Sequence, residues 1–386
     1  MSIRLEEALE VLIDHRGKTP RKLGSDFVSE GVPVASAILV RDGVLDLSEA
    51  RFVDEETYSR WMPVPVKRGD VLLTSEAPLG RVARVRDDAP LVLGQRLFGL
   101  RGKNGVLDDG FLYYALQTDR LQSELSGRAT GTTVVGIRQS ALRDVRISLP
   151  EFSTQRAIGD VLGALDDKIA ANTRLVTTAG HLAAATVRRA LDTSASSRLD
   201  ELAVIKMGSS PTGETLNESG DGLVFYQGVR DFGTRFPSRR VWTTAPTRTA
   251  DEGDVLVSVR APVGEVNLAN EHLCIGRGLA AVRSRSAHQS TLFHLLKHVP
   301  EAWAPYEAEG TVFGSINRAQ LHSLELPRLA DGIDPEALES EVRALESRIA
   351  SALRESSTLT ALRDTLLPQL MSGKLRVREA AEMAGL

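Results

Sequence analysis

Cysteine is nearly absent from this sequence, and long apolar runs are absent altogether. Cys274 is the one cysteine among 386 residues, which excludes an intrachain disulfide framework and a metal site of clustered thiolates. No apolar run approaches the ~18 residues of a membrane-spanning helix, and residues 1–7 lack the apolar core of a secretory signal peptide. We therefore expect a soluble, cytoplasmic protein with no membrane partner.

The common catalytic motifs are missing as well. Gly17-Lys18-Thr19 ends like a phosphate-binding loop, but Leu12 stands where that motif needs its first glycine, and the glycine pair at 131–136 lacks the following lysine. No dinucleotide-binding glycine pattern, nucleophile-elbow serine or adenine-methylating tetrapeptide occurs. His294 and His298 are four residues apart, a spacing more typical of a helix surface than of a metal site. We expect a non-catalytic protein with no metal and no cofactor.

Net charge gives no direct sign of a nucleic-acid partner. The chain has 47 basic and 51 acidic residues, hence a charge of −4 and no global basic field. The acidic excess is concentrated in residues 331–386, which hold 7 basic and 10 acidic side chains. Arginine supplies 39 of the 47 basic residues, and its planar fork suits guanine edges and phosphates. Codon bias in a GC-rich genome is an alternative explanation for this excess of arginine over lysine.

Two halves of the chain repeat one another. GDVLLTSEAPLG at 69–80 aligns with GDVLVSVRAPVG at 253–264, and seven of the twelve positions are identical, where background composition gives about one. Shorter matches keep the same order, with offsets that fall steadily from 191 to 177: Gly17 with Gly208, Gly94 with Gly276, Gly131 with Gly310, and Leu149 with Leu326. Chance matches would not stay collinear, so the sequence predicts an internal duplication.

The length of the chain and its local sequence patterns predict more than one domain. A chain of 386 residues exceeds one ordinary domain. The duplicated segments, 1–150 and 198–328, contain short β-rich runs bounded by glycine and proline, and each carries a later helical stretch, Phe111–Leu125 and Ser290–Trp303. We predict an α+β fold class with two similar domains and a pseudo-twofold internal repeat.

A heptad pattern follows each duplicated segment. Over 151–192 and 334–375, apolar residues alternate at spacings of three and four, which is typical of a coiled-coil seam. Asp334 before Pro335 is a favourable helix start, and Ser153 can cap the first helix. The alternative is that each helix belongs to the core of its neighbouring domain. The residues expected between the paired helices are Ile158, Leu162, Leu165, Ile169, Val176, Leu338, Val342, Leu345, Ile349 and Leu359.

Two polar residues, Asn172 and Ser356, interrupt this seam. Buried polar groups are costly unless they are paired, so one interpretation is that they set the register of the helices. The other is that the seam opens to solvent at these positions.

The order of domain, long helix, domain and long helix resembles the specificity (S) subunit of type I restriction–modification systems. Particular strings carry the resemblance: RGKTP and GSSPTG near the start of each copy, SEAPLGRV with LGQRLFGLR in the first, and SVRAPVGEV with CIGRGLAAVR in the second. LPEFSTQRAIGDVLGALDDKIAANTRL resembles the start of the family's central conserved helix, and LRDTLLPQLMSGKLRV resembles the end of the second helix. The start of the second helix departs from the family, because LPRLADGIDPEALESEVRAL lacks the usual Gln-Arg-Ala-Ile.

The resemblance implies DNA recognition without catalysis in this chain. Each target-recognition domain would read one half of a bipartite target in double-stranded DNA. The helices would pair antiparallel, set the spacer between the half-sites and dock methyltransferase (M) subunits. Motor–nuclease (R) subunits would join for translocation and cleavage. Modest charge is compatible with this role, because phosphate contacts set affinity whereas base-edge contacts set specificity.

Candidate DNA-binding residues lie in the glycine-rich turns of both copies. For each of them a structural role in its turn is an equally good interpretation. They are Lys18, Thr19, Arg96, Thr132, Thr133, Arg138, Ser209, Ser210, Arg277, Thr311, Ser315 and Asn317.

Rival functions stay open at this point. A related subunit could serve a modification-only methyltransferase, which differs only in its partners. A coiled-coil scaffold that binds proteins rather than DNA is the rival from another class. An enzyme with an unfamiliar site is disfavoured by the missing motifs.

Overall fold

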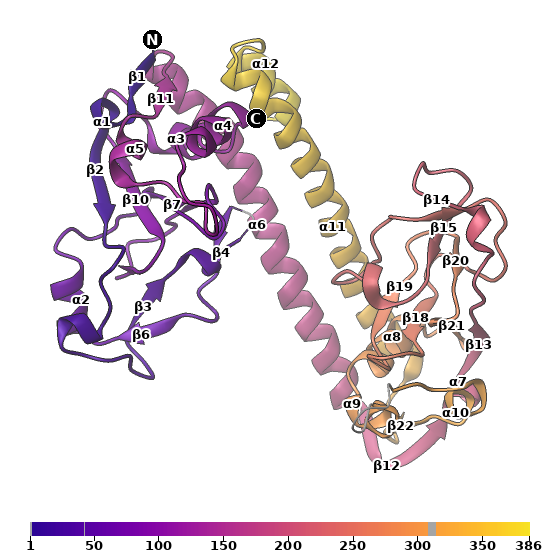
Figure 1. The fold of residues 1–386 in the computed structure, drawn as a ribbon. Helices are drawn as coiled ribbons and strands as arrows, with labels where there is room; N and C mark the ends of the chain where they lie inside the picture. Colours follow the sequence, from indigo (N-terminus) through magenta and orange to yellow (C-terminus); the bar gives the residue numbers. More distant parts are fainter. Residues whose placement is uncertain (1, 42, 308–313) are drawn as a thin grey trace. The chain divides into compact units, whose positions relative to one another are not determined.

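The computed structural model describes residues 2–41, 43–307 and 314–386. The chain forms two compact units, of which unit 1 comprises Met1–Ala171 with Glu355–Leu386 and unit 2 comprises Asn172–Arg354. Each unit combines a central antiparallel sheet and a second, mixed sheet with short helices and half of each long helix (Figure 1). The mixed architecture confirms the predicted α+β class.

A four-stranded antiparallel sheet forms the centre of unit 1. Its strands lie in the order β2 (Leu9–Asp14), β10 (Leu97–Gly102), β7 (Val71–Thr74) and β8 (Val82–Arg84). Both faces of this sheet are covered, since Val71 and Leu73 enter one apolar cluster whereas Leu72 enters another. The second cluster lies against a smaller sheet of three strands: β3 (Val32–Ala35), which runs parallel to β9 (Val92–Leu93), and β6 (Arg51–Val53).

Unit 2 repeats the central sheet of unit 1 strand for strand, and its second sheet has five strands instead of three. Its central sheet has the order β13 (Ala203–Met207), β21 (Leu279–Ser284), β18 (Val255–Ser258) and β19 (Val266–Leu268). Val255 and Val257 again face one cluster and Leu256 the other. The second sheet again contains one parallel pair, β15 (Leu223–Tyr226) with β20 (Leu273–Ile275), flanked by β14 (Leu216–Asn217), β16 (Trp242–Thr243) and β17 (Thr249–Ala250).

Short pairs of strands complete each unit. β12 (Leu191–Arg198) pairs with β22 (Glu325–Leu329), so residues 191 and 192, which were expected in the long helix 151–192, begin a strand instead. The other short elements are β1 (Ser2–Arg4) paired with β11 (Arg146–Ser148), β4 (Val40–Arg41) paired with β5 (Val44–Leu45), and the helices α1 (Leu5–Ala8), α2 (Glu55–Trp61), α5 (Gln139–Arg143), α7 (Leu199–Leu202) and α10 (Arg318–His322).

Each predicted late helical stretch consists of two helices. In unit 1 these are α3 (Asp109–Ala115) and α4 (Asp119–Gly127), and in unit 2 they are α8 (Gln289–Lys297) and α9 (Pro300–Trp303). The hydroxyl of Thr118 accepts a hydrogen bond from the backbone of Leu121 and so starts a new helix. Proline is the first residue of α9, a position where its missing N–H costs nothing.

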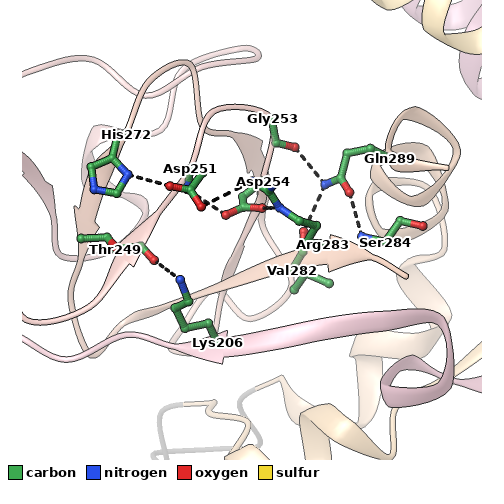
Figure 2. A network of polar contacts seen from close by, with 10 residues as sticks. All are labelled: Lys206, Thr249, Asp251, Gly253, Asp254, His272, Val282, Arg283, Ser284 and Gln289. Carbon is green, nitrogen blue, oxygen red and sulfur yellow. Dashed lines mark hydrogen bonds and ion pairs between the residues drawn. The ribbon is translucent and has the colours of Figure 1, made fainter. Parts of the chain in front are cut away.

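The aspartate of the repeated Gly-Asp-Val-Leu motif has a structural role in both copies. Arg101 donates two hydrogen bonds of 2.7 Å to buried Asp70. Arg283 likewise donates to Asp254 at 2.5 Å, and Figure 2 shows this pair with Asp251 beside it. Because a buried carboxylate must be paired, these two ion pairs explain why the duplicated motif keeps its aspartate.

The long helices are α6 (Phe152–Arg189) and α11 (Pro335–Met371). α6 begins before Ser153, so the prediction that Ser153 caps it is wrong. The predicted cap of α11 is confirmed, because the Asp334 carboxylate accepts the Glu336 N–H at 3.0 Å. No helix among the described residues is long and apolar enough to cross a membrane.

The two long helices run antiparallel and share an apolar cluster in each unit. In unit 1 the first half of α6 packs with the last half of α11, and both also enter the core of the neighbouring domain. The two alternatives for the long helices therefore both hold: they pair with each other, and each also belongs to the core of its neighbouring domain. The buried residues of the expected seam are Ile158, Leu162 and Leu165 in unit 1 and Leu338, Val342 and Ile349 in unit 2, whereas Ile169, Val176, Leu345 and Leu359 are half-buried.

The C-terminal segment differs from the expected continuous helix over 334–375. Gly373 adopts a left-handed conformation with φ 70°, and its N–H donates to the carbonyl of Leu370, which ends α11 at Met371. A further helix, α12 (Val377–Ala384), follows and packs Ala380 into the core of unit 1.

Candidate nucleic-acid interface

Three loops meet where β7 ends and β10 begins, in the central sheet of unit 1. The Ser75 N–H donates to the carbonyl of Arg96 at 2.9 Å, and the Ile137 N–H donates to the carbonyl of Ser75 at 2.9 Å. These bonds join the proline loop 75–80, the glycine turn 94–96 and the end of the threonine loop 131–138. We call this group of loops the three-loop cluster.

Unit 2 contains the same cluster. The Val259 N–H donates to the carbonyl of Gly278 at 2.9 Å, and the Ile316 N–H donates to the carbonyl of Val259 at 3.1 Å. The joined loops are 259–264, 276–278 and the described part of the loop that ends at Asn317. Because the backbone bonds correspond one to one, residues 75, 96 and 137 are structurally equivalent to 259, 278 and 316.

Side chains and a glycine explain why the loops close in this way. A hydroxyl at the end of the strand holds the proline loop, since Thr74 donates to the Pro78 carbonyl and Ser258 donates to the Arg260 carbonyl, both at 2.6 Å. A Cβ atom at Gly94 would lie 2.7 Å from the carbonyl oxygen of Ala35. Only glycine therefore allows the turn to approach β3 this closely.

A cavity adjoins each cluster. In unit 1 it measures about 650 Å³ and is lined in part by Lys18, Thr19 and Arg96. In unit 2 it measures about 670 Å³ and is lined by four arginines: Arg230, Arg240, Arg260 and Arg277. These concave, solvent-exposed surfaces offer hydrogen-bond donors to a ligand.

Some candidate DNA-binding residues of the first copy already have a hydrogen-bond or ion-pair partner within the chain, and others do not. Lys18 donates from Nζ to the Trp61 carbonyl at 2.9 Å, and the Thr19 hydroxyl accepts the Lys22 N–H at 3.3 Å, so both stabilise their turn. Arg96 is exposed but forms an ion pair of 2.9 Å with Glu76. The exposed side chains without a hydrogen bond or ion pair in the described parts of the chain are Thr132, Thr133 and Arg138.

The second-copy serines and Arg277 lie together. The Ser210 hydroxyl donates to Gln227 at 2.8 Å and accepts the Arg277 N–H at 3.2 Å. Ser209 donates its N–H to the Ile275 carbonyl at 3.0 Å and also accepts a bond from Thr247. The guanidinium of Arg277 is exposed and has no partner among the described residues.

The remaining second-copy candidates lie at the end of the third loop. Ser315 is exposed and pairs through its backbone with Arg260. Asn317 caps α10, because its side chain accepts the Gln320 N–H at 3.0 Å. Thr311 lies outside the described residues.

Three charged residues at the clusters were not selected from sequence: Glu76, Arg230 and Arg260. The available signal was the repeat itself, because Glu76 of the first copy aligns with Arg260 of the second. Arg240, by contrast, is bound by Asp231 in a two-pronged contact of 2.6 and 3.0 Å, which raises the pKa of Arg240. In the part of the chain that the structure describes, no group of three metal-ligating side chains occurs.

Comparison with known proteins shows which proteins this chain is similar to. The family model for the type I restriction modification DNA specificity domain matches residues 3–177. A putative type I restriction enzyme specificity subunit of Methanocaldococcus jannaschii is 25% identical over 97% of this chain and 93% of its own length. A second specificity subunit from that organism is 34% identical over 102 residues, which are 26% of this chain and 23% of the relative.

A solved structure shares the fold. The S subunit of a type I restriction–modification system from M. genitalium has a TM-score of 0.66 and 18% identity, over 96% of this chain and 95% of that one. The strings noted in the sequence, the duplicated domains and the full-length relative agree with one another. Over nearly its whole length the chain is similar to specificity subunits of type I restriction–modification systems, and its residues 3–177 match the DNA specificity domain of that family.

Proposed function

We propose that this chain is the non-catalytic DNA-recognition subunit of a type I restriction–modification complex. Each target-recognition domain, 1–150 and 198–328, reads one half of a bipartite target in double-stranded DNA. The observation that carries the proposal is the three-loop cluster, which occurs once in each copy with matching backbone bonds and an adjoining cavity. A duplicated, exposed site on a duplicated scaffold suits two half-sites read by the same kind of surface.

The long helices set the spacer between the half-sites. α6 has 38 residues, which correspond to about 57 Å at 1.5 Å per residue. This length exceeds one turn of DNA, about 34–36 Å, so both half-sites can be read on one face of the duplex. The long helices α6 and α11 also dock the methyltransferase subunits.

Catalysis belongs to the partner subunits in this proposal. M subunits bring the methyl donor and the adenine-flipping site, and R subunits bring the motor and the nuclease. The complex acts in the cytoplasm, where it meets cellular and incoming DNA. A chain of nearly balanced charge then needs only a few base-reading donors, because its partners bind most of the phosphates.

Gel-shift titrations of the chain with and without its M subunit test the proposal. We expect weak, sequence-independent binding by the chain alone and specific binding by the complex. Methylation sequencing of DNA treated with the complex should show a bipartite motif. A protein scaffold would instead bind no DNA in either state, and equal specificity in both states would remove the role of the M subunit.

A further inference from the structure

Equivalent positions of the two three-loop clusters carry opposite charge. Glu76 and Arg260 are equivalent because each follows the residue whose N–H bonds the glycine turn, and each precedes the same Ala-Pro pair. The backbone of Glu76 pairs with Gly136 as that of Arg260 pairs with Ser315. The glycine turns also differ, with Gln95-Arg96 in the first copy where the second has Arg277-Gly278.

The reversal changes what each cluster can offer to a ligand. In the first copy Arg96 and Glu76 form an ion pair of 2.9 Å, so that these two residues present one donor group and one acceptor group. In the second copy Arg260 and Arg277 are exposed, line one cavity and have no side-chain partner within the described residues. These two arginines present donors alone.

We propose that these positions determine the base specificity of the two half-sites. Arg260 and Arg277 read the acceptor edges of guanines in the half-site of the second domain. Glu76 accepts a hydrogen bond from a cytosine or adenine amino group in the other half-site, and Arg96 donates to the neighbouring acceptor. The assignment rests on the proposed function and adds to it the residues and the bases of each half-site.

The opposite charges of Glu76 and Arg260 indicate contacts with base edges rather than with phosphates. Equivalent loops on equivalent domains face the same part of the DNA, and a carboxylate that faced a phosphate would be repelled. Base edges in the major groove offer both donors and acceptors, so either sign of side chain finds a partner there. The exchange of Glu76 for Arg260 is therefore compatible with base edges and incompatible with the backbone.

The test uses the full chain assembled with its M subunit. Arg260→Gln and Glu76→Gln are compared with wild type for the methylated motif and for the salt dependence of DNA binding. Arg328→Gln and Glu30→Gln are matched controls, because both residues are exposed in the same two copies and neither lines a cluster cavity. Thermal unfolding of each variant checks that the fold is retained.

We expect each test substitution to relax the motif in one half only. Discrimination against the wrong base should fall about 10- to 100-fold at one position, in opposite halves for Arg260→Gln and Glu76→Gln. The controls should leave both halves unchanged.

Two results would overturn the assignment while leaving the proposed function intact. One is a specific wild-type complex whose motif survives both substitutions. The other is a uniform loss of affinity for all sequences with a salt slope lowered by about one, which marks a phosphate contact. A wild-type complex with no sequence preference would overturn the proposed function itself.

Discussion

Two ionisable side chains of unit 2 contact the carboxylate of Glu346, which lies in the first half of α11. The His294 ring from α8 is fully buried, and its Nε2 lies 2.7 Å from the carboxylate. The buried guanidinium of Arg235 forms an ion pair with the same carboxylate. Burial lowers the pKa of Arg235 to about 10, which indicates how little water reaches the group. This contact ties the second domain to the long helix through charge rather than through apolar packing.

Removing the carboxylate should destabilise unit 2 strongly. In Glu346→Gln the buried guanidinium loses its counter-charge, and breaking one partner of a buried ion pair costs about 3–5 kcal/mol. The free energy of unfolding from urea titrations measures the loss. Glu341→Gln, an exposed change on the same helix, is the control. Equal stability of the two variants would contradict the structural role of the contact.

Acid should weaken the same region. Burial and the neighbouring cations Arg235, His298 and Lys297 lower the pKa of His294 to about 3. The unfolded chain therefore binds a proton near pH 6.5 that the folded chain rejects, so stability falls as the pH drops from about 6.5 towards 3, by up to about 1.4 kcal/mol per pH unit. His298, stacked on His294, acts in the same direction, because burial lowers its pKa to about 4.

Unfolding midpoints at pH 7 and pH 5 measure this effect. His294→Gln removes the titrating group, so its midpoint should change less between the two values than that of wild type. A variant with the full wild-type pH dependence would show that other groups cause it.

At the scale of elements, each long helix is hydrogen-bonded to the globular domain beside it. Gln155 of α6 accepts the Asp108 N–H at 3.0 Å. Glu339 of α11 accepts the N–H groups of Ser290 and Thr291 at 3.1 and 2.9 Å. Both side chains are buried and bind the start of a helix in the neighbouring domain. The duplication therefore includes the joint between each domain and its helix.

Shortening α6 tests its role as a spacer. Deletion of residues 173–179 removes one heptad, about 10 Å of helix, while it keeps the phase of the seam. If the helix sets the spacer, the methylated motif should lose about three base pairs between its halves, or the complex should fail to assemble. Deletion of four residues is the control, because it rotates the seam and should disrupt pairing. An unchanged motif after the heptad deletion would refute the spacer role.

At the scale of the whole molecule, the net charge of −4 limits how strongly the chain alone can bind the phosphates of DNA. Many arginines are already bound within the chain, such as Arg101 by Asp70, Arg240 by Asp231 and Arg283 by Asp254. A protein with few free cations neutralises few phosphates, so its DNA affinity depends weakly on salt.

The salt dependence of binding should therefore differ between the chain and its complex. We expect the logarithm of the association constant to fall more steeply with salt for the complex with M subunits than for the chain alone. Fluorescence anisotropy at several salt concentrations measures both slopes. Equal slopes would mean that the partners add no phosphate contacts.

The sequence by itself determined the features that depend on local pattern. The collinear repeat around 69–80 and 253–264 predicted the duplication, and spacings of three and four predicted the long helices. The buried seam residues Ile158, Leu162 and Val342 were identifiable because the helical period places apolar side chains on one face. The composition also indicated a chain without a thiolate cluster.

Only the tertiary structure decided which distant residues meet. The second sheet of each copy, the pair of Arg96 with Glu76 and the cluster at Glu346 all join segments from separate parts of the chain. Periodicity carries no information about such contacts, since packing across elements selects them. Whether Lys18 or Asn317 is free to bind DNA or is engaged in its own turn likewise depends on neighbours that only the folded chain supplies.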